Sequence, residues 1–197
     1  SGGGASGSVT ITTSTTNIPT SYGSANTFTE YTLEGYKFQI QQMYLNSGKL
    51  QWRAAGNASG TGTMYNSGTF PGKISSIVLT YNSSDGNKNF TLNVGSSANP
   101  TSGTSITPTS SGLVYTFNCS SQNADYFVLT NGSGAGYLDQ IVINYSGSTT
   151  TYSNYSTQCT ACTPVAATAS YAYPTRTTTC GGSVSNTFTT NSNATVS

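Results

Sequence analysis

Hydrophobic and polar residues alternate with a period of two along several short segments of this chain. In the stretch YKFQIQQM at 36–43, aromatic and aliphatic side chains alternate with Lys and Gln, so that a strand there has one buried and one solvated face. Turn-forming sequences such as Asn46-Ser47-Gly48 and Asp85-Gly86 separate such segments. Related patterns predict further strands at 49–54, 63–66, 74–81, 90–94, 113–118, 126–130 and 137–145, and an edge strand at 9–16.

The order of these segments predicts an all-β chain. Their spacing is typical of a two-sheet antiparallel β-sandwich, and no window is rich in strong helix formers. We expect a linker at 1–8, one β-sandwich at 9–145 and a cysteine-containing linker at 146–163. Residues 164–197 read as the start of a second, Ig-like sandwich. They are fewer than the roughly 40 residues below which a lone domain usually needs further stabilisation, so either disulfides stabilise it or the domain is truncated. We favour truncation, because Ala194-Thr195-Val196-Ser197 ends in the middle of a predicted strand.

Composition narrows the possible functions. Thr (35), Ser (31), Gly (22) and Asn (18) make up 106 of the 197 residues, charged residues are only 6%, and His is absent. The six Lys and Arg residues are scattered singly, which argues against a nucleic acid partner. Without His and with five carboxylates, most acid–base enzymes are also disfavoured. No apolar run approaches the length of about 18 residues that membrane insertion needs. The polar composition with little charge predicts an extracellular or cell-surface protein.

Four cysteines suit disulfides in an oxidising compartment. A zinc site built on the C-x-x-C pair would need further ligands, and a thioredoxin-like redox pair would need a βαβ context that the pattern does not offer. Sequence alone leaves three pairings of four cysteines open. We favour a bond within the second module and one that ties the first domain to its tail, namely Cys162–Cys180 and Cys119–Cys159.

One resemblance adds to this interpretation. The segments KLQWRAAGN, FPGKISSIVLTY and FTLNVGSSANP, followed by YFVLTNGSGAGYLDQIVINY, resemble an accessory jelly-roll-like β-sandwich module of secreted Bacteroidota surface proteins. The tail from CTPVAATASYAY onward resembles the start of a bacterial Ig-like domain. The resemblance covers residues 30–145 and implies a jelly-roll-like sandwich. It also implies a non-catalytic role as a spacer, an adhesive unit or a carbohydrate-binding module.

The same resemblance suggests a structural calcium ion. An L-D-x-I pattern in the last strand of jelly-roll carbohydrate-binding modules often supplies a calcium ligand, and Asp139 stands in that pattern here. Glu30 or Glu34, with backbone carbonyls, would complete an oxygen cage. The alternative is that Asp139 only accepts hydrogen bonds from nearby groups. No other cofactor is expected.

Aromatic residues provide the remaining candidate site. Sugar rings stack on Trp and Tyr, and amide and hydroxyl groups bind their OH groups. Trp52 is the only tryptophan and either faces the core, in phase with Leu50, or stacks on a sugar. The candidate ligand-binding residues are Trp52, Tyr44, Tyr65, Arg53 and Asn57.

These observations favour a non-catalytic structural or adhesive unit of a large surface or filament protein. Its partners would then be other copies or domains of the same protein. The alternative is a carbohydrate-binding module appended to a secreted enzyme, with a polysaccharide as its ligand.

Overall fold

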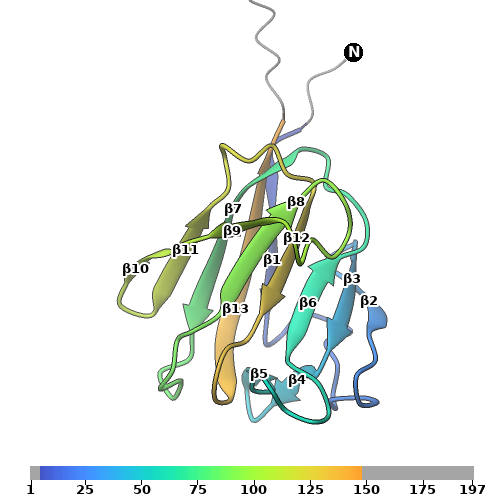
Figure 1. Ribbon diagram of the computed structural model, residues 1–197, viewed down its shortest axis with the longest axis vertical. Helices are drawn as coiled ribbons and strands as arrows, with labels where there is room; N and C mark the ends of the chain where they lie inside the picture. Colours follow the sequence, from blue (N-terminus) through green and yellow to red (C-terminus); the bar gives the residue numbers. More distant parts are fainter. Residues whose placement is uncertain (1–4, 148–197) are drawn as a thin grey trace, which may run out of the picture. The chain divides into compact units, whose positions relative to one another are not determined.

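The computed structural model describes residues 5–147, which fold into thirteen strands and contain no helix (Figure 1). None of these described residues therefore forms a helix that could cross a membrane. The strands are β1 (Gly7–Thr12), β2 (Thr29–Leu33), β3 (Tyr36–Gln41), β4 (Met43–Asn46), β5 (Lys49–Trp52), β6 (Thr63–Asn66), β7 (Lys73–Tyr81), β8 (Thr91–Gly95), β9 (Thr104–Ile106), β10 (Thr109–Ser111), β11 (Val114–Asn118), β12 (Tyr126–Thr130) and β13 (Gly136–Ser146).

Two antiparallel sheets pack against each other, which confirms the predicted β-sandwich. Sheet I has the order β10-β11-β7-β13-β5-β4, and sheet II has the order β2-β3-β6-β12-β8-β9. β13 pairs with β7 along one side, and on its other side it pairs with β1 and then with β5. β1 has no other partner strand among the described residues, so it lies at an edge as the sequence predicted.

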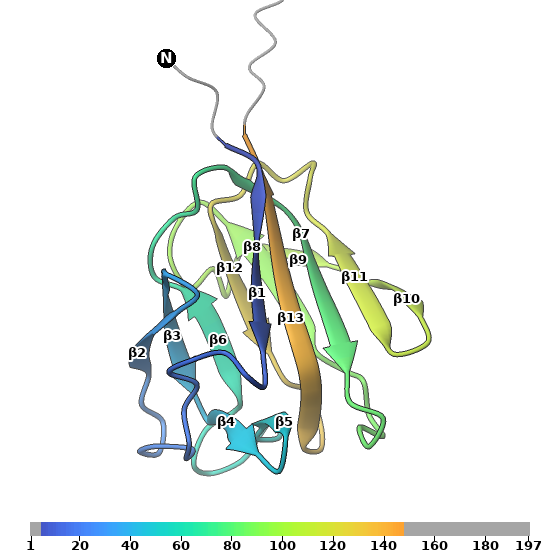
Figure 2. The same cartoon turned by 180° about the vertical axis from the view of Figure 1, so that it is seen from behind.

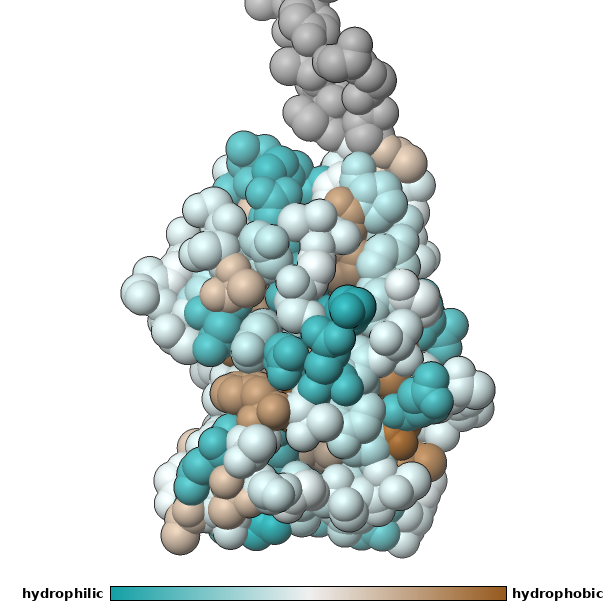
Figure 3. All heavy atoms as spheres, turned by 90° about the vertical axis from the view of Figure 1, so that its right-hand side faces the viewer, coloured by the Kyte–Doolittle hydropathy of each residue, from teal (hydrophilic) through white to brown (hydrophobic). Residues whose placement is uncertain are grey.

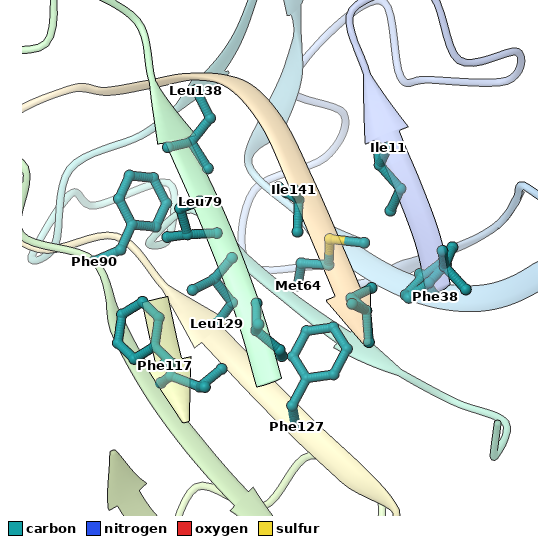
Figure 4. Packing of buried hydrophobic residues seen from close by; sticks show 14 of the residues in the cluster. Ile11, Phe38, Met64, Leu79, Phe90, Phe117, Phe127, Leu129, Leu138 and Ile141 are labelled. Atoms are coloured by element: carbon teal, nitrogen blue, oxygen red, sulfur yellow. The ribbon is translucent and has the colours of Figure 1, made fainter. Parts of the chain in front are cut away.

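The core lies between the sheets and follows the alternation seen in the sequence. In β7, the side chains of Ile77, Leu79 and Tyr81 are fully buried, and the residues between them are half-buried. The buried Phe127 and Leu129 of β12 in sheet II lie close to Leu79 in the core (Figure 4). Full burial of an aliphatic or aromatic side chain of this size contributes about 1.5–3 kcal/mol, so the alternating faces explain why the two sheets associate.

The predicted strand at 36–43 is in fact two strands in different sheets. β3 belongs to sheet II and ends at Gln41, whereas β4 begins at Met43 in sheet I. Between them, Gln42 adopts a left-handed backbone conformation with φ of 53°. Its buried side chain donates a hydrogen bond from Nε2 to the carbonyl of Ser24 at 3.0 Å. Tertiary contacts therefore stabilise a backbone conformation that L residues rarely adopt.

Three further strands were not predicted, and the expected bounds of β1 differ most from those observed. β9 and β10 have three residues each and are mostly exposed, so neither has a hydrophobic alternation to detect. β2 has a single fully buried residue, Leu33, and therefore also lacks a clear hydrophobic alternation. β1 begins at Gly7, inside the predicted linker, and ends at Thr12 rather than at residue 16.

The chain enters and leaves this sandwich at the same end. Gly7 in β1 lies opposite Tyr145 in β13, and the backbone N–H of Gly147 donates to Ser6 Oγ at 3.3 Å. Figures 1 and 2 show the β4–β5 turn, the β7–β8 loop and the β12–β13 loop at the opposite end, which we call the distal end. Loops at the distal end are therefore far from the attachment points of the described domain.

Candidate functional site

Trp52 lies in the core and not on a ligand-binding surface. Its side chain is 0% exposed, and its ring meets that of Phe90 edge to face, with centroids 5.1 Å apart. Its cross-strand neighbours are Met43 in β4 and Gly136 in β13. Because no face of the indole reaches the surface, Trp52 cannot stack on a sugar in this conformation. Of the two alternatives, the side chain of Trp52 therefore faces the core, and Trp52 is no longer a candidate ligand-binding residue.

The outer face of the same strands carries a group of tyrosines. Tyr44, Gln51 and Tyr137 lie in register across β4, β5 and β13, out of phase with the buried Trp52. Tyr22, from the segment before β2, packs edge to face on Tyr44 with centroids 4.4 Å apart. Gln51 Nε2 donates to the Tyr22 hydroxyl at 2.8 Å. With Arg53, these half-buried residues form what we call the tyrosine platform, and Figure 1 places β4 and β5 at the distal end.

Arg53 extends the platform beyond the end of β5. Its Cζ lies 4.0 Å from the centroid of the Tyr22 ring, in a cation–π arrangement. Nη1 donates weakly to Asn57 Oδ1 at 3.5 Å, and the same oxygen accepts the Ser59 N–H at 2.9 Å. Three of the residues expected to bind a ligand, namely Tyr44, Arg53 and Asn57, therefore lie together.

Charges and hydrogen bonds define the chemistry of the platform. Burial raises the pKa of Tyr22, and the hydrogen bond from Gln51 and the charge of Arg53 only partly oppose this shift. Tyr22 therefore stays neutral near pH 7. At the other end of the platform, Lys49 Nζ lies 5.0 Å from the centroid of the Tyr137 ring and donates to Ser84 Oγ at 3.0 Å. The platform thus combines aromatic rings, an amide and the Arg53 cation, and a second cation, Lys49, lies beside it.

Tyr65 belongs to a different surface. It lies in β6 of sheet II, between Gln39 and Val128 of the neighbouring strands. Its ring packs edge to face on Phe28, with centroids 5.1 Å apart, and burial raises its pKa. The structure therefore does not bring Tyr65 together with the platform on sheet I.

The three residues expected to bind calcium are also separated. Asp139 lies in β13 of sheet I, and its Oδ1 accepts a hydrogen bond from Asn82 Nδ2 at 2.7 Å. Glu30 lies in β2 of sheet II, where Lys37 Nζ approaches its Oε1 to 2.9 Å and lowers its pKa. Glu34 is exposed in the turn between β2 and β3. Within residues 5–147, no three His, Cys, Asp or Glu side chains are grouped to hold a metal, so the expected cage is not assembled.

Cys119 is the one expected disulfide residue within the described part of the chain. Its side chain is fully buried, and its Sγ lies 3.5 Å from the carbonyl oxygen of Phe117. Burial raises the pKa of the Cys119 thiol to about 11. Cys159, Cys162 and Cys180 lie outside the described residues. The pairings Cys119–Cys159 and Cys162–Cys180 therefore stay predictions.

We expect the reduced thiol of Cys119 to resist alkylation in the folded protein. A pKa near 11 leaves at least about 100-fold less thiolate at pH 8 than an ordinary cysteine has, and the thiolate is the reactive form. Iodoacetamide labelling of the reduced chain, resolved by peptide mass spectrometry, should modify Cys119 readily only after denaturation. The remaining cysteines are an internal comparison. Rapid native labelling of Cys119 would contradict its burial.

Sequence reasoning missed three members of the platform. Gln51 and Tyr137 lie one position out of phase with Trp52 and Leu138, which are both fully buried. Once Trp52 and Leu138 are known to face the core, the alternation predicts that Gln51 and Tyr137 face outward. Tyr22 had no such signal, because it lies outside any strand and reaches the platform only through tertiary packing.

One further face of the described domain shows no large apolar patch (Figure 3). Figure 3 shows a face of mostly intermediate hydropathy, with small, separate apolar patches. Among the described residues, the exposed large hydrophobic side chains are Leu113 and Val114. Such isolated apolar residues are ordinary on a protein surface and do not by themselves indicate an interface. The tyrosine platform therefore remains the candidate site that the geometry supports best.

No protein-family model matches this chain, and no curated protein matches it. The resemblance to a Bacteroidota surface module and the expected Ig-like tail therefore stay predictions. The functional interpretation consequently depends on the geometry of the described domain.

Proposed function

We propose that this chain is a non-catalytic, extracellular adhesive unit that binds polysaccharide through the tyrosine platform. The observation that carries the proposal is the grouping of Tyr22, Tyr44 and Tyr137 around Gln51 at the distal end. Tyrosine rings offer flat apolar faces for the C–H faces of sugars, and the Gln51 amide and tyrosine hydroxyls can exchange hydrogen bonds with sugar OH groups. Pockets and grooves for ligands commonly combine these two kinds of group.

The position of the platform supports binding more than a spacer role. A spacer in a load-bearing filament passes force from one end to the other, whereas the chain enters this described domain through β1 and leaves it through β13 at the same end. Tension applied there would separate this antiparallel pair one hydrogen-bonded residue pair after another. We therefore favour an adhesive unit that presents a sugar site, with other copies or domains of the same surface protein as further partners.

The proposal that the unit is non-catalytic is supported by the surroundings of its carboxylates. Asp125 is in an ion pair with Lys73, with Oδ2 and Nζ 2.6 Å apart. Both side-chain oxygens of Asp85 accept backbone N–H groups. Carboxylates used in this way do not form the pair across a sugar bond that glycoside hydrolysis needs.

The proposal predicts that Tyr44→Ala weakens polysaccharide binding by about tenfold, which corresponds to about 1.4 kcal/mol. Loss of one aromatic contact accounts for an effect of this size. Affinity gel electrophoresis with soluble polysaccharides and pull-down with insoluble ones would measure the binding of the full chain. Tyr65→Ala is the matched control, because it removes a half-buried tyrosine from sheet II, and it should leave binding unchanged.

Two results would contradict this assignment. If Tyr65→Ala abolished binding and Tyr44→Ala did not, the site would lie on sheet II. If no polysaccharide in a broad panel bound saturably to the wild-type chain, the adhesive unit would have another partner.

A further inference from the structure

We infer that the tyrosine platform binds an anionic polysaccharide, whose sugars carry carboxylate or sulfate groups, and that Arg53 binds the anionic group. This inference rests on the proposed function and specifies its ligand class. It follows from the distribution of charges over the described residues, from the position of the Arg53 side chain, and from the way in which the nearest carboxylates are used.

Basic side chains without a carboxylate partner gather at the distal end. The ion pairs within residues 5–147 are Lys37–Glu30 and Lys73–Asp125. The basic residues of that range with no carboxylate oxygen within 4.0 Å are Lys49, Arg53 and Lys88. Lys49 begins β5, Arg53 directly follows β5, and Lys88 lies in the β7–β8 loop. Figure 1 shows these segments at the distal end. Their charges are thus not neutralised by a neighbouring acid of the described domain.

The nearest carboxylates, Asp85 and Asp139, lie on the Lys49 side of the platform. Asp85 is only 2% exposed. Its Oδ2 accepts the Tyr137 N–H at 2.7 Å, and its Oδ1 accepts two backbone N–H groups of its own loop. Asp139 lies two positions beyond Tyr137, and its carboxylate accepts a hydrogen bond from Asn82. It is on the side of the platform where Lys49 contacts Ser84. The side formed by Tyr22, Tyr44 and Arg53 is therefore the more positive one.

Arg53 is held in place without an acidic partner. Its guanidinium stacks over Tyr22, and its one hydrogen bond from a terminal nitrogen to a described residue is the weak 3.5 Å contact with Asn57. Nε is buried and has no acceptor among the described residues. The two terminal nitrogens of the guanidinium present N–H donors that match carboxylate and sulfate oxygens. A sugar stacked on the adjoining tyrosines would bring its anionic substituent to these donors.

The test compares polygalacturonate with its methyl ester, which has the same backbone without the charge. For the full wild-type chain we expect at least about tenfold weaker binding of the ester, and weaker binding of the acid as salt is raised. Dextran sulfate against dextran is the second pair of probes. Stronger binding of dextran sulfate than of polygalacturonate would assign a sulfate as the anionic group, and the reverse order would assign a carboxylate.

Variants distinguish binding of the anionic probe at Arg53 from a non-specific attraction to the positive charges of the domain. Arg53→Gln should reduce binding of the anionic probe about tenfold, whereas Arg53→Lys should retain part of it. Lys37→Gln removes the same charge from sheet II and should leave binding unchanged. The midpoint of thermal unfolding of each variant shows whether it is folded.

Three outcomes would overturn the inference. The first is equal binding of polygalacturonate and its methyl ester. The second is binding of a neutral polysaccharide when neither polygalacturonate nor dextran sulfate binds. The third is an equal loss of binding affinity in Arg53→Gln and Lys37→Gln. In the first two cases polysaccharide binding, and with it the proposed function, would survive. Absence of saturable binding to every charged and neutral probe would contradict both.

Discussion

Trp52→Ala is expected to lower the free energy of unfolding by about 3–5 kcal/mol. The indole is fully buried between the sheets and packs on Phe90, so its removal leaves a cavity that the surrounding strands cannot fill. Gly136, its cross-strand neighbour, has no side chain to occupy the space, and a Cβ at that position would already meet the Phe90 ring at 2.6 Å. A loss of this size is a large part of the total stability of a typical domain.

Chemical denaturation followed by far-UV circular dichroism would measure this effect. Val114→Ala is the control, because Val114 is exposed, and it should change stability by less than about 0.5 kcal/mol. Trp52→Phe should be destabilised less than Trp52→Ala, since the phenyl ring fills part of the site. It also removes the indole N–H, which has no hydrogen-bond partner among the described residues.

The fluorescence of Trp52 distinguishes a buried position in the core from a position in a ligand-binding site. Because Trp52 is the only tryptophan, its fluorescence in the folded wild type reports one environment. Iodide should quench it poorly, and a polysaccharide should not shift its emission. Loss of polysaccharide binding in Trp52→Phe without any loss of stability would contradict the buried position.

The alternation of side chains predicted most of the sandwich because burial between two sheets requires it. β6 and β12 begin and end at the predicted residues, and β7, β8, β11 and β13 differ by one residue at one or both ends. The turn at Asn46-Ser47-Gly48 was also recognisable, and Ser47 and Gly48 have the positive φ values that a tight hairpin turn requires. Local chemistry determines these features, so a single sequence contains them.

Features that depend on which sheet a strand joins were not predictable. The change of sheet at Gln42 is produced by contacts with Ser24 and Arg53, which are distant in sequence. The separation of Tyr44 from Tyr65, and of Asp139 from Glu30, has the same origin. A list of aromatic or acidic residues in order does not show whether they share a face. For this reason the sequence predicted part of the platform but grouped it with Tyr65 of the opposite sheet and with the buried Trp52.

Asn131→Ala is expected to destabilise the domain by about 3 kcal/mol, or to lower the melting temperature by about 6–12 °C. Asn131 is 2% exposed in the β12–β13 loop. Its Nδ2 donates to the carbonyls of Gly134 at 2.8 Å, Arg53 at 3.1 Å and Trp52 at 3.4 Å. Alanine removes all three hydrogen bonds and leaves buried carbonyls with fewer donors.

Comparison of variants would show that the donated N–H groups are responsible. Asn131→Asp keeps the volume but places oxygen atoms against three carbonyls, so calorimetry should find it at least as unstable as Asn131→Ala. Asn144→Ala, which removes a single hydrogen bond to Ser76 Oγ, should cost only about 1 kcal/mol. An Asn131→Asp variant as stable as the wild type would contradict this account. Because the amide binds the backbone of Arg53, polysaccharide affinity should fall in folded Asn131→Ala as well, which would link the stability of the distal loops to the platform that they support.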